Sequence, residues 1–154
     1  MSPNPTTQLE ARPTERNPPP GSPDSFDPTF RRLKTAVEKG EIGDVHMIHI
    51  TSRDPGPPPV AYIAQSGGLH CDMAIHDFDM ARFIVGSEIV EVFTKGDCKV
   101  DPAIAEAGDI DTSLVVVTFA NGVIGTISNS RKATYGYDQV LTHSLALKGH
   151  GSGS

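Results

Sequence analysis

The sequence predicts an α+β fold, in which a mostly antiparallel or mixed open sheet carries helices on one face. Two segments with helical spacing of apolar residues are interleaved with β-rich segments in the first half, and the second half is mainly β-rich. Two of the later β-rich runs are joined by Asn121-Gly122, the dipeptide favoured in type I′ hairpin turns. A hairpin requires antiparallel neighbours, so the sheet cannot be wholly parallel.

The N-terminal residues 1–25 predict a disordered, proline-rich tail. They hold seven of the thirteen prolines and few large apolar side chains, so they cannot bury a core. The glycine- and serine-rich residues 149–154 predict a second flexible tail. We therefore expect one folded domain over residues 26–148.

Two helices have recognisable boundaries. Asp27 suits an N-cap and Pro28 the first helical position, and Gly40 then supplies a stop. The main helix is expected over 69–85, with Gly86 ending it, and 60–65 could form a short helical turn. The expected core face of the main helix is Leu69, Met73, Met80, Phe83 and Ile84.

The remaining segments predict strands and one long loop. Strands are expected over 44–53, 88–96, 112–120, 123–131 and 139–147, with a loop over 98–110. In the strand that starts at Thr112, both Val115 and Val116 lie in an unbroken apolar run, so both sheet faces are apolar there. Such a sheet predicts a homo-dimer or homo-tetramer that assembles through the sheet face.

Composition excludes several classes of function. The formal net charge of -6 argues against a nucleic-acid partner, which would require a basic surface. No apolar run approaches the roughly 18 residues of a membrane span, and no charged-then-apolar leader opens the chain. Cys71 and Cys98 lack any CxxC spacing, which is typical of a reducing, cytoplasmic setting.

Asp72 and His76 form the strongest candidate for chemistry. On a helix, residues four apart share a face, and a carboxylate beside an imidazole orients the ring and favours its charged form, as a proton-transfer site requires. Gly67-Gly68 precede the pair, and small residues there would let the chain pass close to a ligand. The alternatives are a surface ion pair or a metal site. The spacing of the available nitrogen and oxygen ligands does not match a standard zinc site, so we expect no metal. These ligands are His70, Asp72, His76, Asp77 and Asp79.

The segment 26–138 resembles the C-terminal substrate domain of the glucose–fructose oxidoreductase, inositol dehydrogenase and MocA family. It is most similar to the inositol dehydrogenase branch. The matching stretches, in chain order, are Phe26-Asp27-Pro28-Thr29-Phe30, Gly40-Glu41-Ile42-Gly43, Ser52-Arg53-Asp54-Pro55, Ser66-Gly67-Gly68, Asp72 with His76, Asp77 and Asp79, and Tyr135-Gly136-Tyr137-Asp138.

The resemblance implies a role for five residues. His76 matches the histidine that takes the proton of the substrate hydroxyl as a hydride leaves for the nicotinamide, and Asp72 matches the acid that orients this histidine. Ser52 and Asp54 match strand-end positions that bind substrate hydroxyls. Tyr135 matches a position near the ring of the sugar or polyol.

The sequence also departs from the family. Family enzymes begin with a Rossmann domain that binds NAD or NADP, whereas no G-x-G-x-x-G turn occurs here and the family's Glu-Lys-Pro lysine belongs to that other domain. We therefore expect a truncated substrate-binding domain of an inositol- or sugar-type NAD(P)-dependent dehydrogenase, inactive alone and binding no cofactor by itself. The alternatives are a non-catalytic binding or assembly module, and, more weakly, a cofactor-free, metal-dependent lyase or isomerase.

Overall fold

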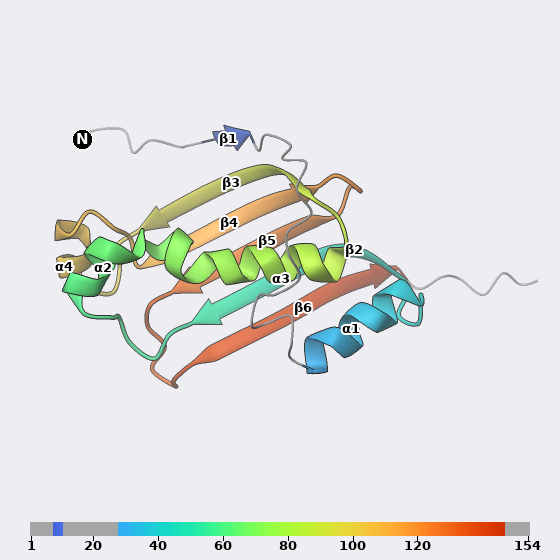
Figure 1. Cartoon of the computed structure of the whole chain (residues 1–154), viewed down its shortest axis with the longest axis horizontal. Helices are drawn as coiled ribbons and strands as arrows, with labels where there is room; N and C mark the ends of the chain where they lie inside the picture. The colour runs from blue at the N-terminus through green and yellow to red at the C-terminus, as the bar shows by residue number, and fades with distance from the viewer. Residues whose placement is uncertain (1–7, 11–27, 147–154) are drawn as a thin grey trace, which may run out of the picture.

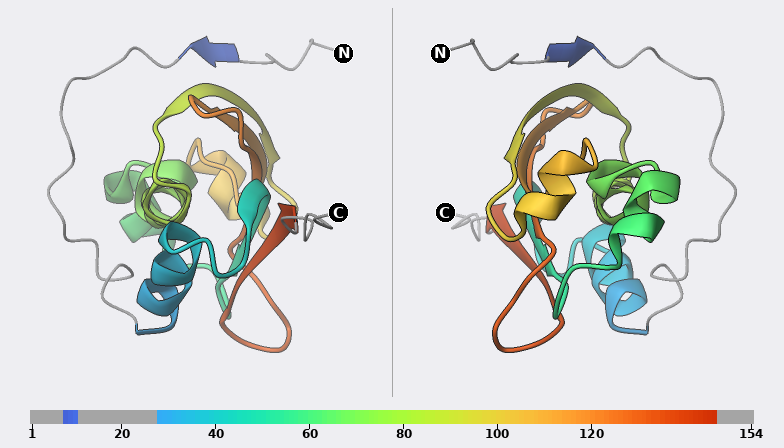
Figure 2. Two further views of the ribbon diagram at one scale, coloured as in Figure 1. Left: turned by 90° about the vertical axis from the view of Figure 1, so that its right-hand side faces the viewer. Right: turned by 90° about the vertical axis from the view of Figure 1, so that its left-hand side faces the viewer.

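The computed structural model describes residues 8–10 and 28–146, and the side chains of residues 28–142. It confirms the α+β fold, with a six-stranded mixed open sheet in the order β1-β3-β4-β5-β2-β6 and helices on one face (Figures 1 and 2). The elements, in chain order, are β1 (Gln8–Glu10), α1 (Pro28–Glu38), β2 (Asp44–Arg53), α2 (Val60–Ser66), the π-helical turn η2 (His70–Ala74), α3 (Ile75–Val85), β3 (Ile89–Asp97), α4 (Pro102–Glu106), β4 (Thr112–Phe119), β5 (Ile124–Ser130) and β6 (Asp138–Ala146).

Strand β2 gives the sheet its mixed character. It pairs in parallel with β5 and antiparallel with β6, while β1, β3, β4 and β5 pair antiparallel in succession. The parallel register places Ser52 opposite Asn129. These two strands therefore present polar side chains side by side at one end of the sheet.

The predicted hairpin is present, but its turn differs from the predicted type I′. Only Gly122 has a positive φ, of 87°, whereas a type I′ turn requires one at Asn121 as well. The Gly122 amide donates to the Phe119 carbonyl at 2.9 Å, and the Phe119 amide donates to the Val123 carbonyl at 2.8 Å. This is the pattern of a three-residue loop with a left-handed glycine, the next most common hairpin connection.

The core lies between the sheet and helix α3. Figure 2 shows α1 and α3 on the same side of the curved sheet. Apolar residues alternate inward along the strands because successive side chains of a strand point to opposite faces. The buried cluster consists of Ile48, Ile50, Met80, Ala81, Ile84, Val85, Val115, Val117, Phe119, Val123 and Ile127.

Two helix predictions need correction. The first turn of the predicted helix over 69–85 is the π-helical turn η2, and the α-helix begins only at Ile75. The predicted loop over 98–110 contains α4, whose N-cap Asp101 accepts a hydrogen bond from the Ala103 amide at 2.9 Å. Asp101 followed by Pro102 is a capping signal that outweighed the loop-like composition.

The expected disordered tail over 1–25 contains a described strand. Gln8–Glu10, which includes no proline, pairs antiparallel with β3. The edge of a sheet presents unpaired amide and carbonyl groups that such a segment can satisfy. The rest of that tail and the predicted tail 149–154 lie outside the described residues.

Apolar side chains remain exposed on the sheet face that the helices leave open. We call this surface, formed by Phe93, Leu114, Val116, Ile124 and Val140, the outer sheet face. Each of these side chains is at least 40% exposed, and they come from β3, β4, β5 and β6. Among the described residues, no helix is both long and apolar enough to cross a membrane.

Gly125 in β5 tests the packing of the core. A Cβ atom at this position would lie 2.8 Å from Cγ2 of Ile48 and 2.9 Å from Cγ2 of Val117. Because both contacts are β-branched side chains held in the core, Gly125→Ala is expected to lower the free energy of unfolding by about 1–3 kcal/mol. Urea denaturation followed by circular dichroism would measure this loss.

The matched control is Gly56→Ala, because a Cβ at Gly56 would meet no atom within 4 Å. This variant should stay within about 0.5 kcal/mol of the wild type. Equal effects of the two substitutions would contradict the packing described for β5.

Candidate active site

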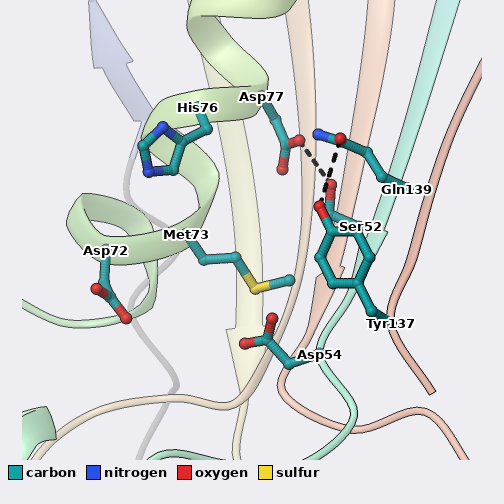
Figure 3. Close-up of a pocket in the computed structure, with 8 residues that line it drawn as sticks. All are labelled: Ser52, Asp54, Asp72, Met73, His76, Asp77, Tyr137 and Gln139. Atoms are coloured by element: carbon teal, nitrogen blue, oxygen red, sulfur yellow. Dashed lines mark hydrogen bonds between the residues drawn. The ribbon is translucent and has the colours of Figure 1, made fainter. Parts of the chain in front are cut away.

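A cavity of about 370 Å³ opens where the ends of several elements meet. The carboxyl end of β2 supplies Ser52, and Asp54 follows it, while η2 and the start of α3 lie opposite (Figure 3). The beginning of β6 forms another side. The lining residues are Ser52, Asp54, Asp72, Met73, His76, Asp77, Tyr137 and Gln139.

Asp77 ties the first turn of α3 to two strands of the sheet. Its side chain is 1% exposed and accepts a hydrogen bond from Ser52 Oγ at 2.6 Å through Oδ1. Its Oδ2 accepts from Asn129 Nδ2, also at 2.6 Å. Hydrogen bonds of this kind stabilise an ionised carboxylate in a buried position. Ser52, expected to bind substrate hydroxyls, lines the cavity and also positions Asp77.

Asp72 has different partners from the one that the helical spacing predicts. Its Oδ1 accepts a hydrogen bond from the Tyr62 hydroxyl at 2.6 Å, and its Oδ2 from Arg131 at 3.1 Å. Figure 3 shows its carboxylate and the His76 ring both at the cavity but pointing in different directions. Asp72 lies in the π-helical turn η2 and His76 lies in the first turn of α3, so the pair spans the junction of the two elements.

Arg131 is the cation behind this carboxylate. It follows β5 directly, and only 1% of its side chain is exposed, yet it forms ion pairs with Asp72 at 3.1 Å and with Asp109 at 3.5 Å. Its backbone amide donates to the Asp111 carbonyl at 2.9 Å. One buried guanidinium therefore joins the end of β5, the turn η2 and the loop before β4.

Gly68, the second glycine of the pair before η2, makes room for a carboxylate of the protein. A Cβ at Gly68, where φ is 87°, would lie 2.8 Å from Oδ1 of Asp109. The same oxygen accepts a hydrogen bond from the Leu69 amide at 3.1 Å. Gly68 thus lets the chain approach Asp109, the second partner of Arg131.

Asp54 lies at the cavity with a carboxyl group whose pKa is raised. Loss of solvent around the group is the largest cause, the positive charge of Arg131 opposes it, and the negative charges of Asp72 and Asp77 add to it. Hydrogen bonds hold its backbone in place, from its amide to the Ser130 carbonyl at 3.0 Å and from the Ala133 amide to its carbonyl at 2.7 Å.

The structure places Tyr135 away from the cavity. Its side chain is 71% exposed, and its hydroxyl donates to Asp138 at 3.1 Å. Tyr137 and Gln139 line the cavity instead, with the Tyr137 hydroxyl 3.4 Å from Gln139 Oε1. Residues two apart in an extended segment point to the same side. Tyr137 and Gln139 are four and two residues before Leu141, which packs on the core, so this alternation could have predicted that they face the cavity and that Tyr135 is not the only candidate.

Of the residues considered for a metal site, Asp72, His76 and Asp77 line the cavity. Within the described part of the chain, no group of three or more histidine, cysteine or acidic side chains could hold a metal ion. The ring of His70 lies instead 3.5 Å from the Thr94 hydroxyl. Partial burial lowers the pKa of His70, which keeps its ring neutral near pH 7.

Comparison with known proteins identifies the family of the chain. Residues 30–149 match the model of the GFO/IDH/MocA C-terminal domain. The chain is 58% identical to the myo-inositol 2-dehydrogenase of Thermotoga maritima over 114 residues, which are 74% of this chain and 34% of that protein. It is 54% identical to the inositol 2-dehydrogenase of Rhizobium meliloti, with the same coverage.

Solved structures show the same relationship. The myo-inositol dehydrogenase of Corynebacterium glutamicum superposes with a TM-score of 0.76 at 44% identity, over 80% of this chain and 37% of that one. The scyllo-inositol dehydrogenase of Lactobacillus casei, solved with NAD(H) and scyllo-inositol bound, gives a TM-score of 0.71 at 29% identity, over 82% and 38%.

The chain therefore belongs to the C-terminal domain family of the GFO/IDH/MocA oxidoreductases. It spans about a third of the length of the curated relatives that it matches.

Arg131→Met tests the buried ion pairs. The substitution preserves much of the side-chain volume but leaves Asp72 and Asp109 without their shared cation, so the free energy of unfolding should fall by about 3–5 kcal/mol. Urea denaturation would measure the loss, and Lys132→Met is the control because Lys132 is adjacent, equally charged and exposed. A loss below about 1 kcal/mol in Arg131→Met would contradict the role of this residue.

Proposed function

We propose that this chain is the substrate-binding domain of an NAD(P)-dependent dehydrogenase that acts on an inositol or a related polyol, and that the cavity holds the polyol. The observation that carries the proposal is the convergence of Ser52, Asp54, Asp72 and His76 on one cavity from two segments that are separate in the sequence. Hydroxyl, carboxylate and imidazole groups are suited to binding the alternating donors and acceptors of a polyol ring. The scyllo-inositol dehydrogenase of Lactobacillus casei supports this ligand class, because its structure was solved with scyllo-inositol bound.

The proposed chemistry assigns His76 the role of general base toward one ring hydroxyl. Asp72, whose carboxylate is held in position by Arg131 and Tyr62, would accept a hydrogen bond from a hydroxyl of the polyol ring. Asp54 and Ser52 would bind further hydroxyls. In the family, the nicotinamide of NAD or NADP accepts the hydride.

The residues of this chain do not fit a nucleotide site. The sequence contains no G-x-G-x-x-G, and within residues 28–146 no glycine-rich turn follows a strand and opens a helix. We therefore propose that the chain alone binds neither NAD nor NADP and does not oxidise the polyol.

A calorimetric titration of the purified chain tests this function. We expect saturable binding of myo- or scyllo-inositol, no binding of NADH, and at least a tenfold loss of inositol affinity in His76→Ala, which removes one hydrogen-bonding group from the cavity. His46→Ala is the control, because His46 lies on β2 outside the cavity and is exposed. Saturable NADH binding, or inositol binding that is unchanged in His76→Ala, would overturn the proposal.

The outer sheet face supports a second candidate function, assembly through the sheet. Phe93, Leu114, Val116, Ile124 and Val140 expose apolar side chains on adjacent strands, and such a surface favours burial against a partner. We propose that a second copy of the chain covers it, in a homo-dimer or homo-tetramer. This role could exist with or without polyol binding.

Val116→Lys tests the assembly. Val116 lies near the middle of the outer sheet face, and a lysine there would place two charges in a two-fold interface, so light scattering should report a monomer. Val60→Lys, at an exposed apolar residue on α2, should leave the oligomer intact. A wild-type chain that is already monomeric at high concentration would refute the assembly.

A further inference from the structure

The electrostatic character of the cavity points to the charge of its ligand. Of the eight lining residues, Asp54, Asp72 and Asp77 carry carboxylates and none is lysine or arginine. Arg131 lies behind Asp72 and is shared with a fourth carboxylate, Asp109, so it leaves an excess of negative charge at the cavity.

The three carboxylates that line the cavity differ in their hydrogen-bond partners. Asp72 is bonded by Tyr62 and Arg131, and Asp77 by Ser52 and Asn129. Figure 3 shows the carboxylate of Asp54 on the side of the cavity opposite α3, with no dashed line to another lining residue. In the described part of the chain its hydrogen bonds are made by its backbone. Asp54 is therefore the carboxylate available to a ligand.

We propose, on the basis of the proposed polyol-binding function, that this cavity selects ligands by charge. It binds an amino-substituted polyol, as the ammonium cation, more tightly than the neutral polyol, and it excludes phosphorylated or carboxylated polyols. Asp54 is the specificity-determining residue.

Simple electrostatics supports this order of affinities. An ammonium group that replaces one ring hydroxyl keeps its size and its donor capacity, and gains Coulombic attraction to Asp54 and Asp77. Desolvation is the largest cause that raises the pKa of Asp54, and the negative charges of Asp72 and Asp77 add to it while the positive charge of Arg131 opposes it. A ligand cation beside Asp54 would therefore stabilise its ionised form. A phosphate or carboxylate on the ring would add a further negative charge to the same partly enclosed space, and its repulsion would be weakly screened.

The test compares three ligands of the same ring by calorimetry at low salt and neutral pH. They are scyllo-inositol, an amino-deoxy-scyllo-inositol and an inositol monophosphate. We expect the amine to bind about tenfold more tightly than the neutral ring, the phosphate at least tenfold more weakly, and the preference for the amine to shrink at high salt.

Asp54→Asn tests the residue that carries the selection. This variant keeps the side-chain shape and should bring the ratio of the amine affinity to the neutral-ring affinity close to one, whatever its effect on the absolute affinity for the neutral ring, whose hydroxyls Asp54 also binds. Asp44→Asn is the control, because it makes the same charge change at the exposed opposite end of β2 and should keep the preference.

Two results would overturn the proposal and leave the polyol-binding function standing. One is a neutral ring that binds as tightly as the amine or more tightly, and the other is an unchanged preference in Asp54→Asn. Failure of both the neutral ring and the amine to bind would overturn the charge selection and the proposed function together.

Discussion

The buried guanidinium of Arg131 is the interaction on which the rest of the site depends. A cation with 1% of its side chain exposed is tolerated only where carboxylates and hydrogen bonds compensate for its lost hydration. Asp72 and Asp109 supply that compensation, and each is held by a separate segment: Asp72 by η2 and the Tyr62 hydroxyl, Asp109 by the Leu69 amide. Gly68 makes the approach of Asp109 sterically feasible. The position of the Asp72 carboxylate at the cavity is therefore a consequence of charge pairing beneath it.

A second set of interactions fixes the other wall. Asp77 connects α3 to β2 and β5 through two short hydrogen bonds, and the parallel pairing of those strands places its donors Ser52 and Asn129 side by side. The cavity thus lies between a buried ion-pair cluster and a buried polar network. In both, each carboxylate has two hydrogen-bond partners that restrict its orientation, as the positioning of a ligand with several equivalent hydroxyls requires.

Much of this fold is predictable from the sequence, because hydrophobic periodicity, capping residues and turn residues are local signals. Helix α1, the C-terminal end of α3 at Gly86 and the strands from β2 to β6 follow from such signals. The π-helical turn does not, since nothing in residues 70–74 distinguishes it from an α-helix. Arg131 and Asp109 were missed because a charged residue at the end of a strand or in a loop normally indicates a solvated surface. Only tertiary packing reveals that these two residues are enclosed.

The order in which the chain is synthesised adds a constraint on the interior strand β2. Its parallel partner β5 lies far along the chain, with His49 and Thr126 separated by 77 residues, and β6 follows later still. During translation both edges of β2 stay unpaired until most of the chain has emerged. Until then, its apolar residues Ile48 and Ile50 lack the residues of β4 and β5 that pack against them in the core. Non-local and parallel pairing of this kind slows folding and prolongs exposure to aggregation. Nascent chains of this domain should therefore depend on chaperones until β5 and β6 have left the ribosome.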